Sequence, residues 1–429
     1  MTRPMRGLPP ATLEEIVSNR ALREAARTAL LWHDRAVVLG RVASLTAQRA
    51  ESIASLLSRG STVATLMSDT PGVITTTLAI WRTGGTVVPL DPRLAPEEIA
   101  RRLAHTGASG LIAHEEHVER AERALGALES QRKGGTRKRA GVQLLVSRSS
   151  RLVPGRIVPR RERARGGERD VRVNEVAFIA YPGGDGAADR AVVLTHTNVM
   201  ASVLRVSIAR GDGPEDVALA TRPLWDVSAL VADVLSRLVT GGAVAIVARR
   251  DVGTLLAAIE QHRTTDVCLS DEARTELTEA GRIPARAVRS VRKLISARSR
   301  SAMTVRRALA DRFPDAETIE TYGKLETTDG ILSARHGIVF RKPDTLGLPH
   351  PGLVVSILDP AGRALKPGAI GEIACRGAVV MRGYHRAPAL TRQVLGAGWL
   401  RTGDLGCIDA DGEVQLVGAR DKLVRQHGA

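Results

Sequence analysis

The stretch YPGGDGAADRAVVLTH, residues 181–196, contains residue types that could bind phosphate. Glycines let a backbone bend closely around an anion, and a basic side chain adds positive charge. The residues that could do so here are Gly183, Gly184, Gly186 and Arg190. Phosphate loops normally offer hydroxyl groups and avoid acids, but this stretch has no Ser or Thr before Thr195 and contains Asp185 and Asp189. The pattern predicts a loop that keeps the shape of a phosphate site and has lost most of its chemistry.

The chain has only three tyrosines, and each lies beside a glycine in a turn-like motif. Tyr181 opens the glycine loop, Tyr322 lies in TYGKLETT, and Tyr384 lies in MRGYHRAP. Sparse tyrosines often simply mark strand ends. That interpretation is less satisfactory when all three lie beside glycine-bearing turns.

The segments that must position these motifs alternate between helix and strand. Apolar spacing and capping signals predict helices over residues 12–30, 46–59, 71–82 and 96–107, and from about 197. Short apolar runs predict strands over residues 61–67, 86–90, 109–113, 175–181, 243–248, 266–270 and 292–297. Such alternation indicates mostly parallel sheets with helices on both faces. From residue 347, short extended runs with turns predict a small β-rich subdomain.

Length and composition limit the class of protein. A chain of 429 residues is expected to form two or three lobes with a substantial core. No apolar run approaches the ~18–20 residues of a membrane helix, and the N-terminal segment lacks the apolar stretch of a secretory signal. The three cysteines, Cys268, Cys375 and Cys407, have no metal-ligand spacing. These features predict a cytoplasmic protein with no transmembrane segment and no zinc site.

The net charge of +16 is concentrated in one segment. Residues 131–170 contain 13 Lys or Arg and 3 Asp or Glu, with no aromatic residue. Proteins that bind single-stranded nucleic acid normally interleave aromatic side chains on which bases stack. The segment therefore favours a solvated, partly flexible insertion over a nucleic-acid or acidic-partner surface.

Three motifs together resemble those of the AMP-forming adenylate-ligase superfamily, which includes acyl-CoA synthetases, aryl-CoA ligases, luciferases and peptide-synthetase adenylation domains. The loop at 181–196 has the length and both ends of the family's Y-T-S-G-T-T-G-x-P-K-G-V-V-L-T-H. YGKLE, residues 322–326, is similar to the family's Y-G-x-T-E. The family's segment ending in G-W-L-x-T-G-D-L is nearly whole here, as GEIACRGAVVMRGYHRAPALTRQVLGAGWLRTGDLG. The resemblance covers nearly the whole chain apart from the basic segment.

The resemblance implies an α/β fold, the large N-terminal region of an adenylate-forming ligase. It consists of two α/β subdomains plus a small β-rich subdomain, with a nucleotide cleft between them. The implied divisions are an N-terminal α/β subdomain over 1–130, the basic insertion over 131–170, an α/β subdomain with the degenerate phosphate loop over 171–345, a β-rich subdomain over 346–421, and a truncated hinge over 422–429.

The family's reaction suggests a role for each retained residue. ATP and a carboxylate form an acyl adenylate and pyrophosphate, and a thiol such as coenzyme A then takes the acyl group. The resemblance implies that Tyr322 faces the adenine, that Asp404 accepts hydrogen bonds from both ribose hydroxyls, and that Glu326 coordinates magnesium. The residues assigned to binding ATP or AMP are Gly183, Gly184, Gly186, Arg190, Tyr322 and Asp404. No catalytic residue is assigned.

Several positions depart from the family pattern. Leu325 replaces a threonine that contacts phosphate, and Arg298 stands where the family has glycine. Trp225 and Asp226 replace the last two residues of P-L-F-H, and Ala419 replaces a ribose-side arginine. These departures predict weakened chemistry rather than a different fold.

The family's hinge would fall near Lys422, so its C-terminal domain, which carries a catalytic lysine, is expected to be missing or supplied by a separate chain or an acyl-carrier partner. The leading hypothesis is an acyl-CoA synthetase-like protein that takes a small carboxylic acid and a nucleotide and adenylates weakly or not at all as an isolated chain. The alternative is a catalytically dead nucleotide- or acyl-binding or scaffolding module. A third hypothesis, nucleic-acid association through residues 131–170, is disfavoured.

Overall fold

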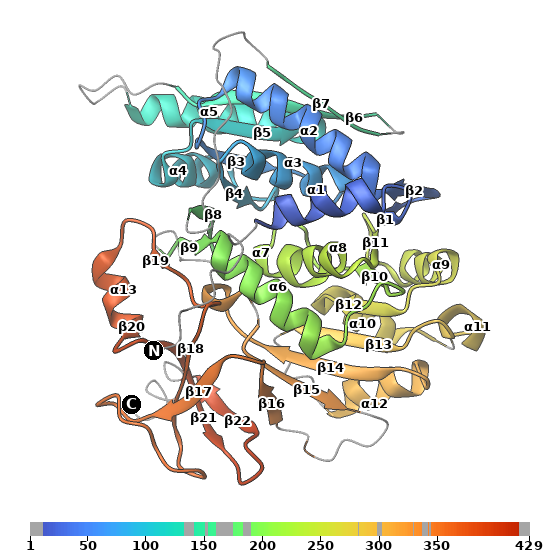
Figure 1. Cartoon of the computed structure of the whole chain (residues 1–429), viewed down its shortest axis with the longest axis vertical. Helices are drawn as coiled ribbons and strands as arrows, with labels where there is room; N and C mark the ends of the chain where they lie inside the picture. Colours follow the sequence, from blue (N-terminus) through green and yellow to red (C-terminus); the bar gives the residue numbers. More distant parts are fainter. Residues whose placement is uncertain are drawn as a thin grey trace, which may run out of the picture.

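The fold is α/β, as the sequence predicts, and contains two large sheets (Figure 1). The structure is a computed structural model that describes residues 12–132, 141–150, 153–159, 175–182, 190–281, 283–297, 303–328, 330–336, 342 and 345–419. None of the helices in these ranges is both long and apolar enough to cross a membrane.

The smaller sheet has eight strands in the order β19-β9-β8-β4-β3-β5-β6-β7. Its bounds are β3 (Thr62–Leu66), β4 (Thr86–Leu90), β5 (Gly110–His114), β6 (Gln143–Ser150), β7 (Val153–Pro159), β8 (Val176–Ala180), β9 (Val192–Thr195) and β19 (Gly383–Tyr384). The strands from β8 to β6 are parallel, and β7, β9 and β19 join antiparallel. The helices that alternate with its first strands are α2 (Leu39–Leu56), α3 (Pro71–Arg82), α4 (Pro96–Thr106), η1 (Glu115–His117) and α5 (Val118–Arg132).

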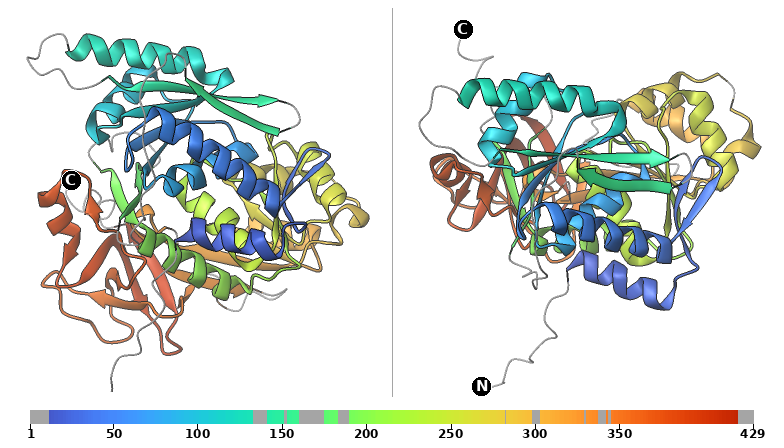
Figure 2. Two further views of the ribbon diagram at one scale, coloured as in Figure 1. Left: turned by 45° about the horizontal axis from the view of Figure 1, so that its top comes forward. Right: turned by 90° about the horizontal axis from the view of Figure 1, so that it is seen from above.

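The larger sheet has fourteen strands in the order β17-β18-β21-β22-β16-β15-β14-β13-β12-β10-β11-β1-β2, with β20 paired to β21. Its parallel half contains β1 (Thr28–Trp32), β10 (Val217–Ala220), β11 (Ala243–Ile246), β12 (Asp266–Leu269), β13 (Lys293–Ala297) and β14 (Glu317–Tyr322). The antiparallel strands are β2 (Arg35–Val38), β15 (Leu332–His336), β16 (Thr345–Pro349), β17 (Val354–Leu358), β18 (Gly371–Arg376), β20 (Leu395–Gly396), β21 (Trp399–Ile408) and β22 (Val414–Ala419). Those after β15 form the β-rich region predicted from residue 347, drawn in orange and red in Figure 2.

Helices cover both sheets and fill the space between them. The remaining helices are α1 (Leu13–Arg23), α6 (His196–Arg210), α7 (Val227–Ala229), η2 (Leu230–Leu235), α8 (Ser236–Thr240), α9 (Val252–His262), α10 (Asp271–Glu279), α11 (Ala285–Val288), α12 (Met303–Arg312), η3 (Leu325–Thr327) and α13 (Pro388–Val394). One buried cluster joins α1, α2, α3, α6 and α8 to strands of both sheets. Separate clusters pack α4 and α5 on the smaller sheet and α9 to α12 on the larger one. The two sheets are thus sandwiched by three helical layers.

Two predicted helices have different bounds in the structure. The capping box is present, since Thr12 and Glu15 exchange side-chain and backbone hydrogen bonds, but α1 ends at Arg23 rather than near residue 30. Residues 28–32 instead form β1, whose backbone pairs with β11 on one side and with β2 on the other. The second helix, predicted over 46–59, runs over Leu39–Leu56. At the end of α1, strand pairing outweighs the local helix signal, whereas α2 begins earlier than predicted and buries Leu39, Val42 and Leu45.

The basic segment contains part of the smaller sheet. Within residues 131–170, β6 pairs in parallel with β5 and antiparallel with β7. Residues 143–150 and 153–159 therefore belong to a sheet, which corrects the prediction of a solvated insertion there. Sheet membership also departs from the linear order of the chain, because β1 joins the larger sheet and β19 joins the smaller one. The linear boundaries at residues 130, 170, 345 and 421 remain a prediction.

Two buried histidines make the fold sensitive to acid. His196 begins α6, is 3% exposed and packs edge-on against Trp81, and His350 follows β16 and is 2% exposed. Burial lowers the pKa of each imidazole to about 4, and nearby arginines add to the lowering for His350. In the unfolded chain the pKa of histidine is about 6.5. As the pH falls below about 6.5, the unfolded chain therefore binds more protons than the folded chain does.

We expect the free energy of unfolding to change little between about pH 7 and about pH 8 and to fall as the pH drops from about 6.5 toward 4. At about pH 5 the loss is about 2 kcal/mol per histidine. Urea unfolding at about pH 7.5 and about pH 5 measures it. His350→Phe, which does not titrate, should reduce the acid-induced loss by about that amount. The control His33→Gln changes an exposed histidine and should leave the loss unchanged. An identical loss in wild type and His350→Phe would contradict the prediction.

Candidate functional site

Two sequence motifs meet at a hydrogen bond between Tyr322 and Asp404. Tyr322 ends β14, and Asp404 lies in β21. The Tyr322 hydroxyl donates to Asp404 Oδ2 at 2.7 Å, and Lys324 Nζ lies 3.1 Å from the same oxygen. Burial and then the Asp404 charge raise the pKa of Tyr322, so its hydroxyl stays protonated and can donate. The structure thus brings together the residues predicted to face the adenine and to bind the ribose.

Glu326, the predicted magnesium ligand, is held at the other end of the YGKLE motif. The Tyr384 hydroxyl donates to Glu326 Oε1 at 2.7 Å, and the Met381 backbone N–H donates to the Glu326 carbonyl oxygen at 2.8 Å. Tyr384 pairs with Val192 of β9, which ties Glu326 to the strand that follows the glycine loop. Burial and then the Glu326 charge raise the pKa of Tyr384, while the Arg190 charge opposes the rise. Arg190 is therefore within electrostatic reach of this pair.

The glycine loop itself lies mostly outside the described residues. Residues 183–189 hold the three predicted glycines and both aspartates, and the structure describes only the flanks. Tyr181 before the loop is buried, with its hydroxyl 2.8 Å from His105 Nδ1 and its ring 4.4 Å from the guanidinium carbon of Arg102. Arg190 after the loop is exposed. The entry to the loop is thus anchored on α4.

The departures from the family pattern have separate structural explanations. Leu325 is 5% exposed and packs in the same core cluster as Tyr322, so it supplies apolar contact where a hydroxyl was expected. Asp226 caps α7 by accepting a hydrogen bond from the Ser228 N–H at 2.9 Å. Arg298 and the Ala419 side chain lie outside the described residues.

A separate cleft of about 1330 Å³ is a second feature that could hold a ligand. It is lined by the β1–β2 hairpin and by segments that follow β3, β4, β5, β10, β11 and β12, where both sheets present the carboxyl ends of parallel strands. Open α/β sheets bind ligands at this edge. Trp225 lines the cleft with Arg93 lying 5.6 Å from its ring centroid, and Ser68 contacts both His117 Nε2, at 2.8 Å, and Glu116. Tyr322, Glu326 and Asp404 are not among the residues that line it.

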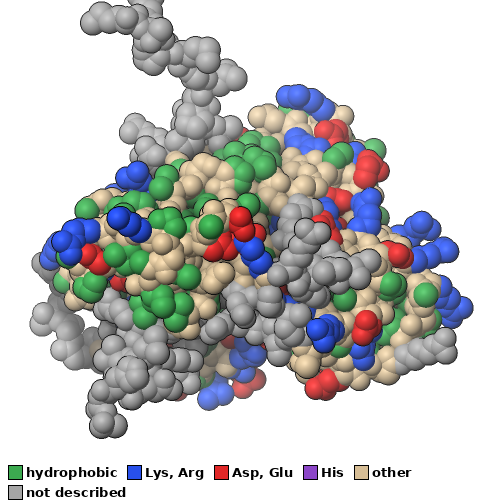
Figure 3. All heavy atoms as spheres, turned by 90° about the horizontal axis from the view of Figure 1, so that it is seen from below, with side chains coloured by type: hydrophobic (Ala, Val, Ile, Leu, Met, Phe, Trp, Pro, Cys, Tyr) green, Lys and Arg blue, Asp and Glu red, His purple; other side chains and the backbone are tan. Residues whose placement is uncertain are grey.

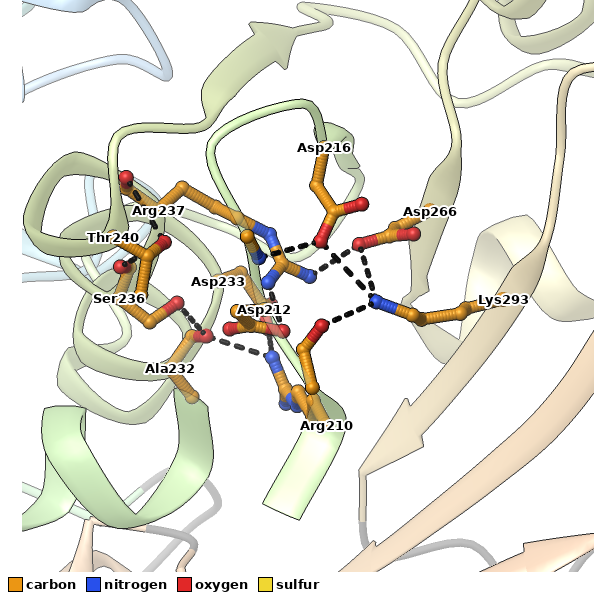
Figure 4. Close-up of polar contacts among 12 residues, drawn as sticks. Arg210, Asp212, Asp216, Ala232, Asp233, Ser236, Arg237, Thr240, Asp266 and Lys293 are labelled. Carbon is orange, nitrogen blue, oxygen red and sulfur yellow. Dashed lines mark hydrogen bonds and ion pairs between the residues drawn. The ribbon is translucent and has the colours of Figure 1, made fainter. Parts of the chain in front are cut away.

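A cluster of acids at the opposite edge of the larger sheet is not a convincing metal centre. Ligand atoms of Asp212, Asp216 and Asp266 lie within 4.8 Å of one another. Figure 4 shows Arg237 and Lys293 pointing into this group. Arg237 contacts Asp212 and lies 2.6 Å from Asp266 Oδ2, while Lys293 Nζ lies 3.2 Å from Asp216 Oδ2. Arg292 adds a third cation, 2.9 Å from Asp216 Oδ1, so three cations face the three carboxylates and the arrangement is that of an ion network.

Charged side chains of both signs are mixed on one described face of the molecule. On the face seen in Figure 3, Lys and Arg side chains are interspersed with Asp and Glu rather than gathered in one basic stripe. Proteins that bind nucleic acid through its phosphates present clustered positive charge, which this face does not show in its described part. Most basic residues of 131–170 lie outside the described residues, so the nucleic-acid hypothesis stays a prediction.

Sequence reasoning missed two parts of the site. Lys324 was visible in YGKLE, where a lysine stands between the predicted adenine-facing and magnesium-binding residues, but no role was assigned to it. The Tyr384–Glu326 hydrogen bond joins residues 58 positions apart, and no local pattern predicts such a pairing.

The chain is similar to known proteins in sequence and in fold. The sequence pattern of the family described as AMP-binding enzyme matches residues 18–385. Feruloyl-CoA synthase from an Amycolatopsis species is 28% identical over 360 residues, covering 83% of this chain and 68% of the relative. A benzoate CoA ligase from Burkholderia xenovorans LB400 has a TM-score of 0.82 at 21% identity, covering 96% of this chain and 81% of that one. O-succinylbenzoate coenzyme A synthetase from Bacillus subtilis, solved in complex with ATP and magnesium ion, has a TM-score of 0.79 at 21% identity, covering 96% and 81%. This chain belongs to the AMP-binding enzyme family and is similar to acyl-CoA synthetases.

Proposed function

We propose that the site around Tyr322, Asp404 and Glu326 binds the nucleotide of an acyl adenylate. The proposal rests on one observation: the 2.7 Å hydrogen bond between Tyr322 and Asp404 joins the motif YGKLE, residues 322–326, to the motif RTGDLG, residues 401–406. Tyr322 offers an aromatic face to adenine, and Asp404 offers a carboxylate to the two ribose hydroxyls. A carboxylate that accepts two hydrogen bonds recognises a cis-diol well, since bonds to a charged group are the stronger ones.

Glu326 fits a role as the magnesium ligand. Magnesium prefers oxygen ligands and is often bound by one or two carboxylates plus the phosphates of a substrate. The Tyr384 hydroxyl fixes one Glu326 oxygen at 2.7 Å. Bound there, the ion would neutralise phosphate charge, while Tyr384 orients the carboxylate that holds it.

We place the acid and the acceptor thiol, coenzyme A, in or beside the 1330 Å³ cleft. Its lining includes Arg35, Arg41 and Arg93, whose guanidinium groups suit phosphate. Feruloyl-CoA synthase and the benzoate CoA ligase are named for aromatic acids, which supports a small carboxylic acid as the substrate class.

A second candidate is a nucleotide-binding module with little or no catalysis. Leu325 favours it, because this side chain is buried in the core and offers no hydroxyl to a phosphate. The loss of hydroxyls and the presence of Asp185 in the glycine loop also favour a module with little or no catalysis.

We expect AMP, or an acyl-sulfamoyl adenosine, to bind at least as tightly as Mg-ATP. AMP needs mainly Tyr322 and Asp404, whereas ATP must also place its outer phosphates near Asp185. Titration calorimetry with the three ligands measures the order of affinities. ATP–pyrophosphate exchange with a panel of carboxylic acids separates the two candidates, and we expect it to be weak. A clear preference for Mg-ATP together with robust exchange would contradict our interpretation of the loop.

A further inference from the structure

Lys324 occupies a position in the nucleotide site that the family motif does not assign to a basic residue. Its Nζ lies 3.1 Å from Asp404 Oδ2, the same oxygen that accepts from the Tyr322 hydroxyl. It stands in the chain midway between Tyr322 and Glu326. A lysine is therefore held between the predicted ribose carboxylate and the predicted magnesium ligand.

The backbone of Lys324 is fixed, whereas its side chain is partly exposed. The Lys324 backbone N–H donates to Thr327 Oγ1 at 3.2 Å, in the turn that begins η3. The Lys324 side chain is 32% exposed, and its partner Asp404 is 18% exposed. Ion pairs that water reaches contribute little to stability. The ammonium group also has three donors, so its contact with Asp404 leaves others for a ligand.

A bound nucleotide adds negative charge near this ammonium group. Once ribose hydroxyls donate to Asp404, the phosphate attached to that ribose must lie nearby, and it brings at least one negative charge. A flexible four-carbon side chain lets the ammonium group follow that charge without moving the backbone. The two anions, Asp404 and the phosphate, would then share one cation.

We propose that Lys324 is a phosphate ligand of this site, binding the phosphate of AMP or of an acyl adenylate. The inference rests on the proposed function, since it requires the nucleotide to bind at Asp404. It adds a residue that the family motif leaves unspecified and that helps to explain how phosphate is held beside a glycine loop without hydroxyls. An ammonium–phosphate contact contributes about tenfold to hundredfold in affinity.

The test compares AMP with adenosine, because the two ligands differ only in the phosphate. Calorimetric titration of both is performed on wild type, Lys324→Met and Lys324→Arg. Lys342→Met is the matched control, since Lys342 is also partly exposed and pairs with Asp409, at 2.8 Å, away from the motif. Thermal melting checks that each variant folds as the wild type does.

Lys324→Met is expected to weaken AMP binding by about tenfold to hundredfold and to change adenosine binding by less than about twofold. Lys324→Arg should retain most of the affinity for AMP, and Lys342→Met should bind both ligands as wild type does. Unchanged AMP binding in Lys324→Met, or an equal loss for both ligands, would overturn the inference. Tighter adenosine binding in that variant would also overturn it, because the lysine would then compete with ribose for Asp404. If the wild type binds neither ligand, the proposed function itself fails.

Discussion

Asp404→Ala is expected to weaken AMP binding by about a hundredfold or more. The substitution removes the carboxylate proposed to accept from both ribose hydroxyls, and each hydrogen bond to a charged group contributes about 1.5–3 kcal/mol. It also leaves the Tyr322 hydroxyl without its acceptor at 2.7 Å and Lys324 without its ion-pair partner. Titration calorimetry with AMP and with adenosine measures the loss, which should be similar for the two because both contain the ribose.

The same β-hairpin offers a matched control for this variant. Asp411 lies in the turn between β21 and β22, and its side chain is 73% exposed. Asp411→Ala should bind AMP as wild type does. Asp404→Asn should bind with intermediate affinity, because the amide keeps one acceptor oxygen and loses the charge. If Asp404→Ala bound AMP normally, the nucleotide would have to lie elsewhere, and the 1330 Å³ cleft would be the next place to test.

Arg237→Met is expected to lower the free energy of unfolding by about 3–5 kcal/mol. Arg237 is fully buried and contacts Asp212 and Asp266, so the substitution leaves buried carboxylates with only Lys293 to balance them. Burial already raises the pKa of Asp266 against the opposing charges of Arg237 and Lys293. Native proteins are stable by about 5–15 kcal/mol, so the loss is large, and urea unfolding at about pH 7.5 measures it.

Two further variants test the ion-network interpretation. Arg286 is an arginine whose side chain is 80% exposed, and Arg286→Met should change the stability by less than about 0.5 kcal/mol. Adding Asp266→Asn to Arg237→Met should recover part of the loss, because it removes a buried charge that has lost its partner. Magnesium or calcium should leave the unfolding midpoint of Glu326→Gln unchanged, since this variant lacks the proposed magnesium ligand. A midpoint raised by either ion in that variant would instead assign Asp212, Asp216 and Asp266 to a metal site.

Local sequence signals predicted some elements of the fold correctly and gave wrong bounds for others. The Thr12–Glu15 capping box is a contact between near neighbours, and the structure contains it as predicted. The helix predicted from this capping box extended to about residue 30, yet residues 28–32 form a strand. Their partners, Ala243–Ile246, lie more than 200 residues away, and pairing with them buries Leu30 completely. The apolar run at 243–248 predicted a strand there, but nothing in either segment identifies the other as its partner.

Composition alone did not predict the strands within the basic segment, residues 131–170. Its lysines and arginines indicated solvation, but β6 and β7 within it complete one edge of the smaller sheet. Charge composition describes the average environment of a segment and says little about one short run such as QLLV, whose leucines Leu144 and Leu145 are buried. A strand of this length needs only a few apolar residues on one face.

The sequence by itself determined the family, which matches residues 18–385. It also supplied the candidate nucleotide residues, because YGKLE (322–326) and RTGDLG (401–406) are contiguous motifs, and their roles stay a prediction. Only the tertiary structure decided which of these residues meet. Tyr322 bonds to Asp404 across 82 positions, and Tyr384 bonds to Glu326 across 58. It also decided that Lys324 lies against Asp404 while Leu325 turns into the core. The physical reason is that a motif specifies local backbone and residue type, whereas the direction and partner of each side chain depend on how distant strands pack around it.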